Sequence, residues 1–127
     1  MGRVILDSSV LIASASTSHV HFEAARQSLS QRHHYAISVI TLSEILVPYF
    51  AQGEVIGRQY RSRLLKDISQ IVDTDQEVAV LASQIRAESG IKIPDALISA
   101  TAAVHKLELW TFDKQLAKAT KGARLLK

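Results

Sequence analysis

Short apolar segments alternate with helical patterns along this chain, and the alternation limits the possible folds more than any other feature. The segments expected to form strands are 3–6, 35–38, 71–72, 107–111 and 124–126. Strands joined through helices run parallel, and a parallel sheet needs helices on both faces. We therefore predict an α/β fold of three layers, α/β/α, around a central parallel sheet of four to five short strands.

Helical periodicity and end signals mark the stretches between these strands. Asp75 and Gly90 flank one pattern as a cap and a stop, and Pro48 is expected to end another. We expect seven helices. The first is short, follows Asp7 and ends near residue 15. The others are expected at 19–31, from about 42 to near 48, at 53–69, 75–90, 95–105 and 114–119. Two Pro and five Gly are spread singly among them, so we expect one domain over residues 1–127.

Composition excludes several classes of protein. The chain has no cysteine, which rules out a disulfide framework and a thiolate metal site. Its longest apolar run, residues 78–82, is far short of the roughly 20 residues that cross a bilayer, and the start lacks a signal-peptide pattern. We expect a soluble, cytoplasmic protein without membrane contact. The net charge of +3 is compatible with nucleic-acid binding without arguing for it.

Four carboxylates occupy one kind of position in this pattern. Asp7 ends the first strand, Glu44 lies at the start of the helix after the second, Asp95 opens an Ala-rich helix, and Asp113 follows the fourth strand. In an open parallel sheet, ligands bind beyond the carboxyl ends of the strands. Residues at these junctions can therefore converge on one crevice although they are far apart in the chain.

Each acid also has a purely structural explanation. Asp7 and Asp113 are typical helix caps, and Asp95 suits the positive end of a helix dipole. Thr41 and Glu44 fit a capping box, in which two side chains satisfy backbone donors reciprocally. Taken singly, each acid is more simply explained as structural, whereas the set of four favours a shared site.

Four convergent carboxylates repel one another unless cations neutralise them or some stay protonated. Oxygen-only ligands suit a hard divalent cation such as Mg²⁺ or Mn²⁺. Such a site supports phosphodiester hydrolysis, because a metal lowers the pKa of a bound water and stabilises charge on the attacking and leaving oxygens.

The segments that carry these acids resemble a known family. They are Val4 to Ile12, Leu42-Ser43-Glu44, Ile93 to Ile98 and Thr111-Phe112-Asp113. In order and spacing they are similar to the acidic signature of PIN domains, and the chain's length is most similar to the VapC toxins of prokaryotic toxin–antitoxin pairs. The resemblance implies a Mg²⁺- or Mn²⁺-dependent endoribonuclease that acts on RNA and forms a homodimer. It also implies a cognate antitoxin that binds promoter DNA and covers the acidic groove.

Residue by residue, the resemblance assigns catalytic and metal-binding roles to the acids. Asp7, Glu44 and Asp95 match the core metal ligands, and Asp113 matches a more variable fourth acid. Ser9 and Thr111 stand where the family has supporting hydroxyls.

Two lysines flank these junctions and are candidates for phosphate contacts with RNA. They are Lys92 and Lys114, for which a solvated surface role is equally good. A basic cluster within 53–69 is most simply a solvated helix face, while the apolar side of that segment is either core or a contact for a partner. Trp110 and Phe112 are expected in the core.

Three other interpretations compete with this one. The main one is a non-catalytic PIN-like module that binds RNA or protein, which has no physical reason to keep four clustered charges. A phosphoacceptor or dehalogenase-like site would place a second Asp where Ser9 stands. The five His include close pairs but lack acids at ligand spacing, which argues against a histidine metal site.

Overall fold

The computed structural model describes residues 2–127, and its centre is a five-stranded sheet in which every pairing is parallel. The strands are β1 (Arg3–Leu6), β2 (His34–Ser38), β3 (Gln70–Val72), β4 (Glu108–Thr111) and β5 (Arg124–Leu125). They lie in the order β3-β2-β1-β4-β5, so β1 is central and pairs with β2 on one side and β4 on the other. The predicted parallel sheet is confirmed.

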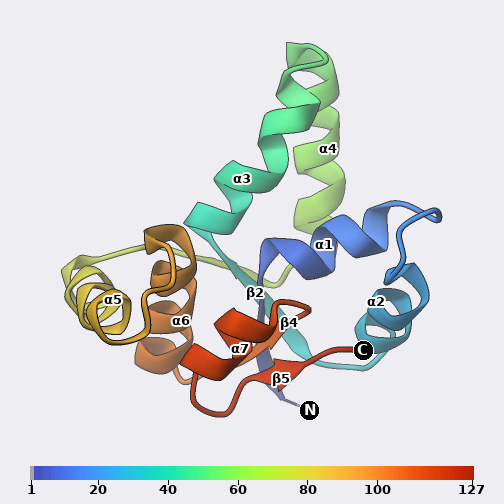
Figure 1. Ribbon diagram of the computed structural model, residues 1–127. Helices are drawn as coiled ribbons and strands as arrows, with labels where there is room; N and C mark the ends of the chain where they lie inside the picture. Colours follow the sequence, from blue (N-terminus) through green and yellow to red (C-terminus); the bar gives the residue numbers. More distant parts are fainter. Residues whose placement is uncertain (1) are drawn as a thin grey trace.

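Helices connect the strands and cover the sheet (Figure 1). They are α1 (Ser8–Ala15), α2 (Phe22–Leu29), α3 (Val39–Phe50), α4 (Glu54–Asp67), α5 (Gln76–Ser89), α6 (Ile93–His105) and α7 (Lys114–Ala119). Asp75 caps α5 through the N–H of Val78, and Gly90 ends it in the left-handed conformation at φ 77°, as the sequence predicts. Within residues 2–127, no helix is long and apolar enough to span a bilayer.

Side chains alternate across the strands into two cores. Ile5 of β1 and Leu109 of β4 join the core formed with α5, α6 and α7. Leu6 and Trp110 join the opposite core, which α1, α3 and α4 complete. Both cores bury apolar area that an exposed sheet face would leave in water. This arrangement gives the predicted three layers.

Helix α3 differs from its prediction at both ends. It begins at Val39, three residues before Leu42, because Ser38 caps it by accepting the N–H of Ile40. It also continues through Pro48 to Phe50, so the predicted stop at Pro48 is wrong. Proline removes the bond to the carbonyl four residues back, on Glu44. Both residues are exposed, so water can replace that bond.

Helices α3 and α4 form a hairpin that projects from the body of the molecule (Figure 1). Tyr49 and Tyr60 stack between the two helices with ring centroids 3.6 Å apart. Leu64, nearer the sheet, is buried in the core, whereas Val55 and Ile56 near the tip are 67% and 39% exposed. The apolar face predicted for 53–69 is therefore core at one end and open at the other.

The remaining helices keep their predicted positions with shifted ends. Helix α2 is shorter than 19–31, because the chain makes turns before Phe22. Helix α6 begins at Ile93, which places Pro94 and Asp95 in its first turn, where a missing N–H costs nothing and a carboxylate is favoured. Trp110 is buried as expected, while Phe112 is only half-buried.

Candidate active site

Asp7 is the most buried of the four candidate acids, with 6% of its surface exposed. It leaves the end of β1 and occupies the cap position of α1, but its side chain makes no capping bond. Its two oxygens instead accept hydroxyl protons, Oδ1 from Ser9 at 2.6 Å and Oδ2 from Thr111 at 2.9 Å. The carboxylate is thus held between the first turn of α1, through Ser9, and the end of β4, through Thr111.

The direction of these two hydroxyls is fixed by the backbone that follows β4. Ser9 Oγ accepts the N–H of Phe112 at 3.1 Å, and Thr111 Oγ1 accepts the N–H of Asp113 at 2.9 Å. A hydroxyl has one proton, so each of these, once it accepts a backbone donor, turns its own proton toward Asp7. Each Asp7 oxygen retains a further lone pair for another ligand.

Glu44 and Asp95 lie near Asp7 but make no hydrogen bond with it. Glu44 projects from the second turn of α3, and Asp95 from the first turn of α6. The capping box, the structural alternative for Glu44, does not form, because Ser38 caps α3 and Glu44 is exposed. The Thr41 hydroxyl is buried and has no hydrogen-bond partner within residues 2–127.

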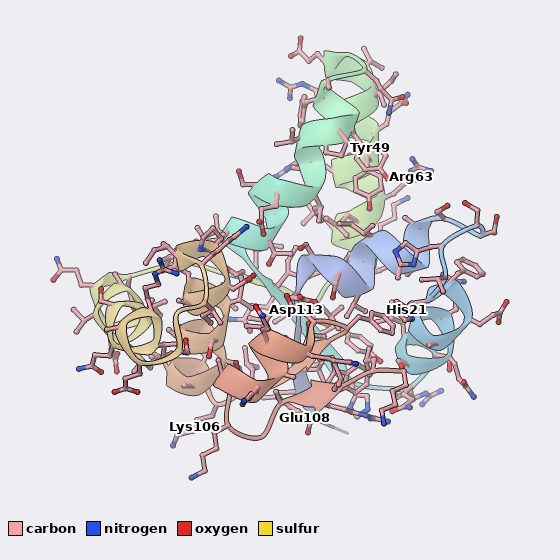
Figure 2. The ribbon with its side chains drawn as sticks, in the orientation of Figure 1. His21, Tyr49, Arg63, Lys106, Glu108 and Asp113 are labelled. Carbon is pink, nitrogen blue, oxygen red and sulfur yellow. The ribbon has the colours of Figure 1, made fainter. Side chains whose placement is uncertain are left out.

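The fourth acid, Asp113, has a structural role. Its Oδ1 accepts the N–H groups of Gln115 and Leu116 and so caps α7, the alternative that its sequence position allowed. Figure 2 shows Asp113 where α7 begins. Its charge still reaches the site, because it is one cause of the raised pKa of Asp95.

The surroundings of Asp7, Glu44 and Asp95 disfavour the ionised forms of these three acids. Burial raises the pKa of Asp7, Glu44 and Asp95 above their ordinary values. Like charges add to the rise: Asp95 acts on Asp7, both act on Glu44, and Asp113 acts on Asp95. The Ser9 and Thr111 hydroxyls oppose the rise in the pKa of Asp7. These four acids are therefore neighbours whose ionised forms would gain from a cation.

The donor set fits a hard divalent ion, since it consists of oxygens with free lone pairs and mutually repelling charges. The side chains are not closed around one point, however. Among residues 2–127, no three His, Cys, Asp or Glu side chains stand together as a ready metal cage. Mg²⁺ commonly keeps several waters and takes only one or two carboxylates directly, so a closed cage is not required.

The two candidate lysines are placed differently. Lys92 precedes α6 and lies close enough to lower the pKa of Asp95, against the effect of burial. Arg86 holds the turn that carries Lys92, donating to the carbonyls of Gly90 at 2.6 Å and Ile91 at 2.9 Å. Lys114 is exposed at the first position of α7, next to Asp113 in the chain.

Sequence reasoning missed a neighbour of the site. The His21 ring stacks on Phe112, with centroids 4.4 Å apart and planes 11° from parallel. Figure 2 labels His21 near α1 and α2, in a part of the chain remote from Phe112 in sequence. No local pattern signals such a contact, because neither residue has a helix or strand periodicity that points to the other.

A separate cleft of about 740 Å³ lies between α1, α2 and α4. Its lining includes Leu11, Arg26, Tyr60 and Arg63, and none of the four acids. The cleft and the acidic site are therefore distinct features of the surface.

The fold and the site define a class of protein: a parallel α/β domain with neighbouring acids that come from two strand ends and two helices. The sequence profile of the PIN domain family matches residues 4–122, and this chain belongs to that family. A comparison with curated proteins gave no match.

Solved structures share the fold over nearly the whole chain. A protein of a toxin–antitoxin complex from Klebsiella pneumoniae is 29% identical with a TM-score of 0.79, covering 95% of both chains. FitAcB from Neisseria gonorrhoeae is 23% identical with a TM-score of 0.80, covering 96% of both. VapC20 of Mycobacterium tuberculosis, described as a sarcin-ricin loop cleaving toxin, is 13% identical with a TM-score of 0.77, covering 95% of this chain and 98% of that one. These likenesses show that the fold is shared along nearly the full length of each of the three proteins.

Proposed function

We propose that this protein is a metal-dependent endoribonuclease, the toxin of a toxin–antitoxin pair, and acts as one domain over residues 1–127. Membership of the PIN family and the names of the structural neighbours support a ribonuclease toxin. The observation that carries the proposal is Asp7, a buried carboxylate with both oxygens oriented by hydroxyls, beside Glu44 and Asp95. A buried carboxylate beside other acids lowers the stability of a folded protein unless a cation or another ligand binds to it.

In this proposal Asp7, Glu44 and Asp95 hold Mg²⁺ or Mn²⁺, directly or through its waters, and Asp113 adds negative charge. A metal held by these acids would supply an activated water and would stabilise charge on the phosphate oxygens. Ser9 and Thr111 keep the Asp7 oxygens pointed at the crevice. A carboxylate of the site that is not bound to the metal is suited to accept the proton of the attacking water.

Hydrolysis adds that water across one phosphodiester bond and leaves two RNA ends. Lys92 lies where a cation can meet a phosphate beside Asp95, and Lys114 is a second candidate at the start of α7. Both lysines would contribute to binding more than to chemistry.

The partners and location follow from the same proposal. The Klebsiella neighbour is described as a toxin–antitoxin complex, which supports a cognate antitoxin protein as the partner here. We further propose a homodimer that acts on RNA in the cytoplasm without membrane attachment.

The direct test is cleavage of a mixed structured RNA by purified protein with EDTA, Mg²⁺ or Mn²⁺. We expect cutting with either metal, none with EDTA, and none in Asp7→Asn or Asp95→Asn. Glu88→Gln is the matched control, since it removes an exposed carboxylate on α5. Metal-dependent cutting that survives in both Asn variants would assign the activity elsewhere or to a contaminant.

Binding can be tested apart from catalysis. A ligand that binds only the folded state stabilises it by mass action, by about 2.7 kcal/mol at 100 times its dissociation constant. We expect Mn²⁺ to raise the melting temperature of the wild type and of Glu88→Gln, but not of Asp7→Asn. A wild type that neither cleaves RNA nor responds to Mn²⁺ would favour the non-catalytic PIN-like binding module.

A further inference from the structure

The stacked pair of His21 and Phe112 joins two parts of the chain that are distant in sequence. His21 immediately precedes α2, and Phe112 lies between β4 and α7. The His21 side chain does not cap α2, although its backbone N–H donates to His19 Nδ1 at 3.0 Å. The His19 ring is tilted 41° from His21 at 5.8 Å. The close parallel contact of His21 is with Phe112, at 4.4 Å.

Phe112 belongs to the link that orients Asp7. Its N–H donates to Ser9, and the next N–H, of Asp113, donates to Thr111. Those two hydroxyls donate to the two oxygens of Asp7. A displacement of Phe112 therefore moves both backbone donors at once, and with them the proton directions at Asp7.

We propose that His21 is a positioning residue for Asp7, which it holds in place through the stack on Phe112. The expected effect of His21 on metal binding rests on the proposed function, whereas the contact between His21 and Phe112 does not. Groups behind a metal ligand fix its orientation and thereby its affinity for the metal. His21 acts on Asp7 indirectly, because it fixes the backbone that orients the two hydroxyls bonded to Asp7.

The size of the effect follows from the stack. An aromatic pair contributes a factor of roughly 2 to 10 to the equilibrium that it favours. Loss of the His21 ring is expected to raise the population in which the Phe112 link is open by about that factor. A ring without nitrogens keeps the stack, so His21→Phe is the conservative variant.

The first experiment needs no metal. Amide hydrogen exchange is measured in the wild type, His21→Ala, His21→Phe and the control His34→Ala. His34 is a half-buried histidine bonded to Gln70 at 3.1 Å, at the start of β2 and so at the opposite edge of the sheet. We expect the amides of Phe112 and Asp113 to exchange about fivefold faster in His21→Ala. We expect His21→Phe and His34→Ala to match the wild type at these two amides.

The second experiment measures Mn²⁺ binding by calorimetry and RNA cleavage as a function of Mn²⁺ concentration. His21→Ala is expected to raise the dissociation constant for Mn²⁺ and the Mn²⁺ concentration at half-maximal rate by the same factor, about fivefold. The KM for RNA should not change, and His21→Phe should restore both quantities.

Several results would overturn the inference. They are unchanged exchange at Phe112 and Asp113 in His21→Ala, faster exchange spread evenly over all amides, or no rescue by His21→Phe. A wild type without Mn²⁺ binding or cleavage would instead overturn the proposed function. In that case the exchange result alone still confirms or refutes the contact between His21 and the link that orients Asp7.

Discussion

Thr111 Oγ1 donates a hydrogen bond of 2.9 Å to Asp7 Oδ2, joining two residues 104 positions apart in the chain. Both lie at the carboxyl ends of adjacent strands, since Leu6 of β1 pairs with Trp110 of β4. Thr111 is fully buried, and it also accepts the N–H of Asp113. One hydroxyl thus ties the central strand, the candidate metal ligand and the start of α7 together.

Replacing Thr111 with Val should destabilise the fold by about 2 kcal/mol, because it removes a bond to a buried carboxylate and leaves the N–H of Asp113 without its partner. The matched control is Thr101→Val. Thr101 is equally buried, but its hydroxyl bonds only to the carbonyl of Leu97 within α6, so a change of about 0.5 kcal/mol or less is expected. Urea unfolding of the two variants checks the difference, and equal losses would show that the bond to Asp7 adds no stability.

Asp95→Asn should stabilise the metal-free protein at neutral pH. Burial and the charge of Asp113 raise the pKa of Asp95 above its ordinary value of 3.8. A raised pKa means that the folded state binds the proton more tightly than the unfolded state, so this group lowers stability as pH rises through its folded pKa. Asn carries no charge at any pH in this range, so Asp95→Asn does not lose stability in this way.

The expected gain is about 0.5 kcal/mol near pH 7, kept small because Asp95 is half-exposed and screened by water. It should shrink as pH falls toward about 4, where the carboxyl is increasingly protonated in both states. Thermal unfolding in EDTA across this range measures it, with Glu88→Gln as the control. A gain that grows on acidification would contradict the sign of the pKa shift.

Gly57→Ala should loosen the α3–α4 hairpin. Alanine favours a helix by about 1 kcal/mol over glycine, but here its Cβ would overlap the ring of Phe50 on the facing helix. Overpacking of this kind costs roughly 1–3 kcal/mol. We expect net destabilisation in Gly57→Ala and recovery when Phe50→Ala is added, as a double-mutant cycle would measure. An additive pair would mean that the Phe50 ring moves aside freely.

Thr41→Val should leave stability unchanged or increase it by about 1 kcal/mol. The Thr41 hydroxyl is fully buried and has no hydrogen-bond partner among the residues that the structure describes, so removing it lifts a desolvation penalty at nearly constant volume. Chemical unfolding of the variant provides the measurement. A loss above 1 kcal/mol would reveal a partner for this hydroxyl, such as a bound water.

Local features of the fold could be predicted from the sequence because they depend on neighbouring residues. The alternation of apolar runs and helical patterns gave the parallel sheet, and Asp75 and Gly90 gave both ends of α5. The start of α3 was missed because Ser38 lies inside the apolar pattern of the strand, where its capping role is hidden. The end of α3 was predicted wrongly at Pro48, because the hydrogen bond that proline removes is less costly to lose on an exposed helix face.

The positions of four acids along the chain predicted that they gather at one edge of a parallel sheet, and the charges of Asp7, Asp95 and Asp113 do act on neighbouring acids of the set. The contacts that each acid makes there follow from the folded chain. Asp113 caps α7, whereas Asp7 leaves its helix uncapped and turns to Ser9 and Thr111. A cap joins groups two or three residues apart, which a sequence displays. Ser9 is equally near Asp7 in the chain, but the bond from Thr111 requires β4 to lie beside β1, and only the folded chain brings those strands together.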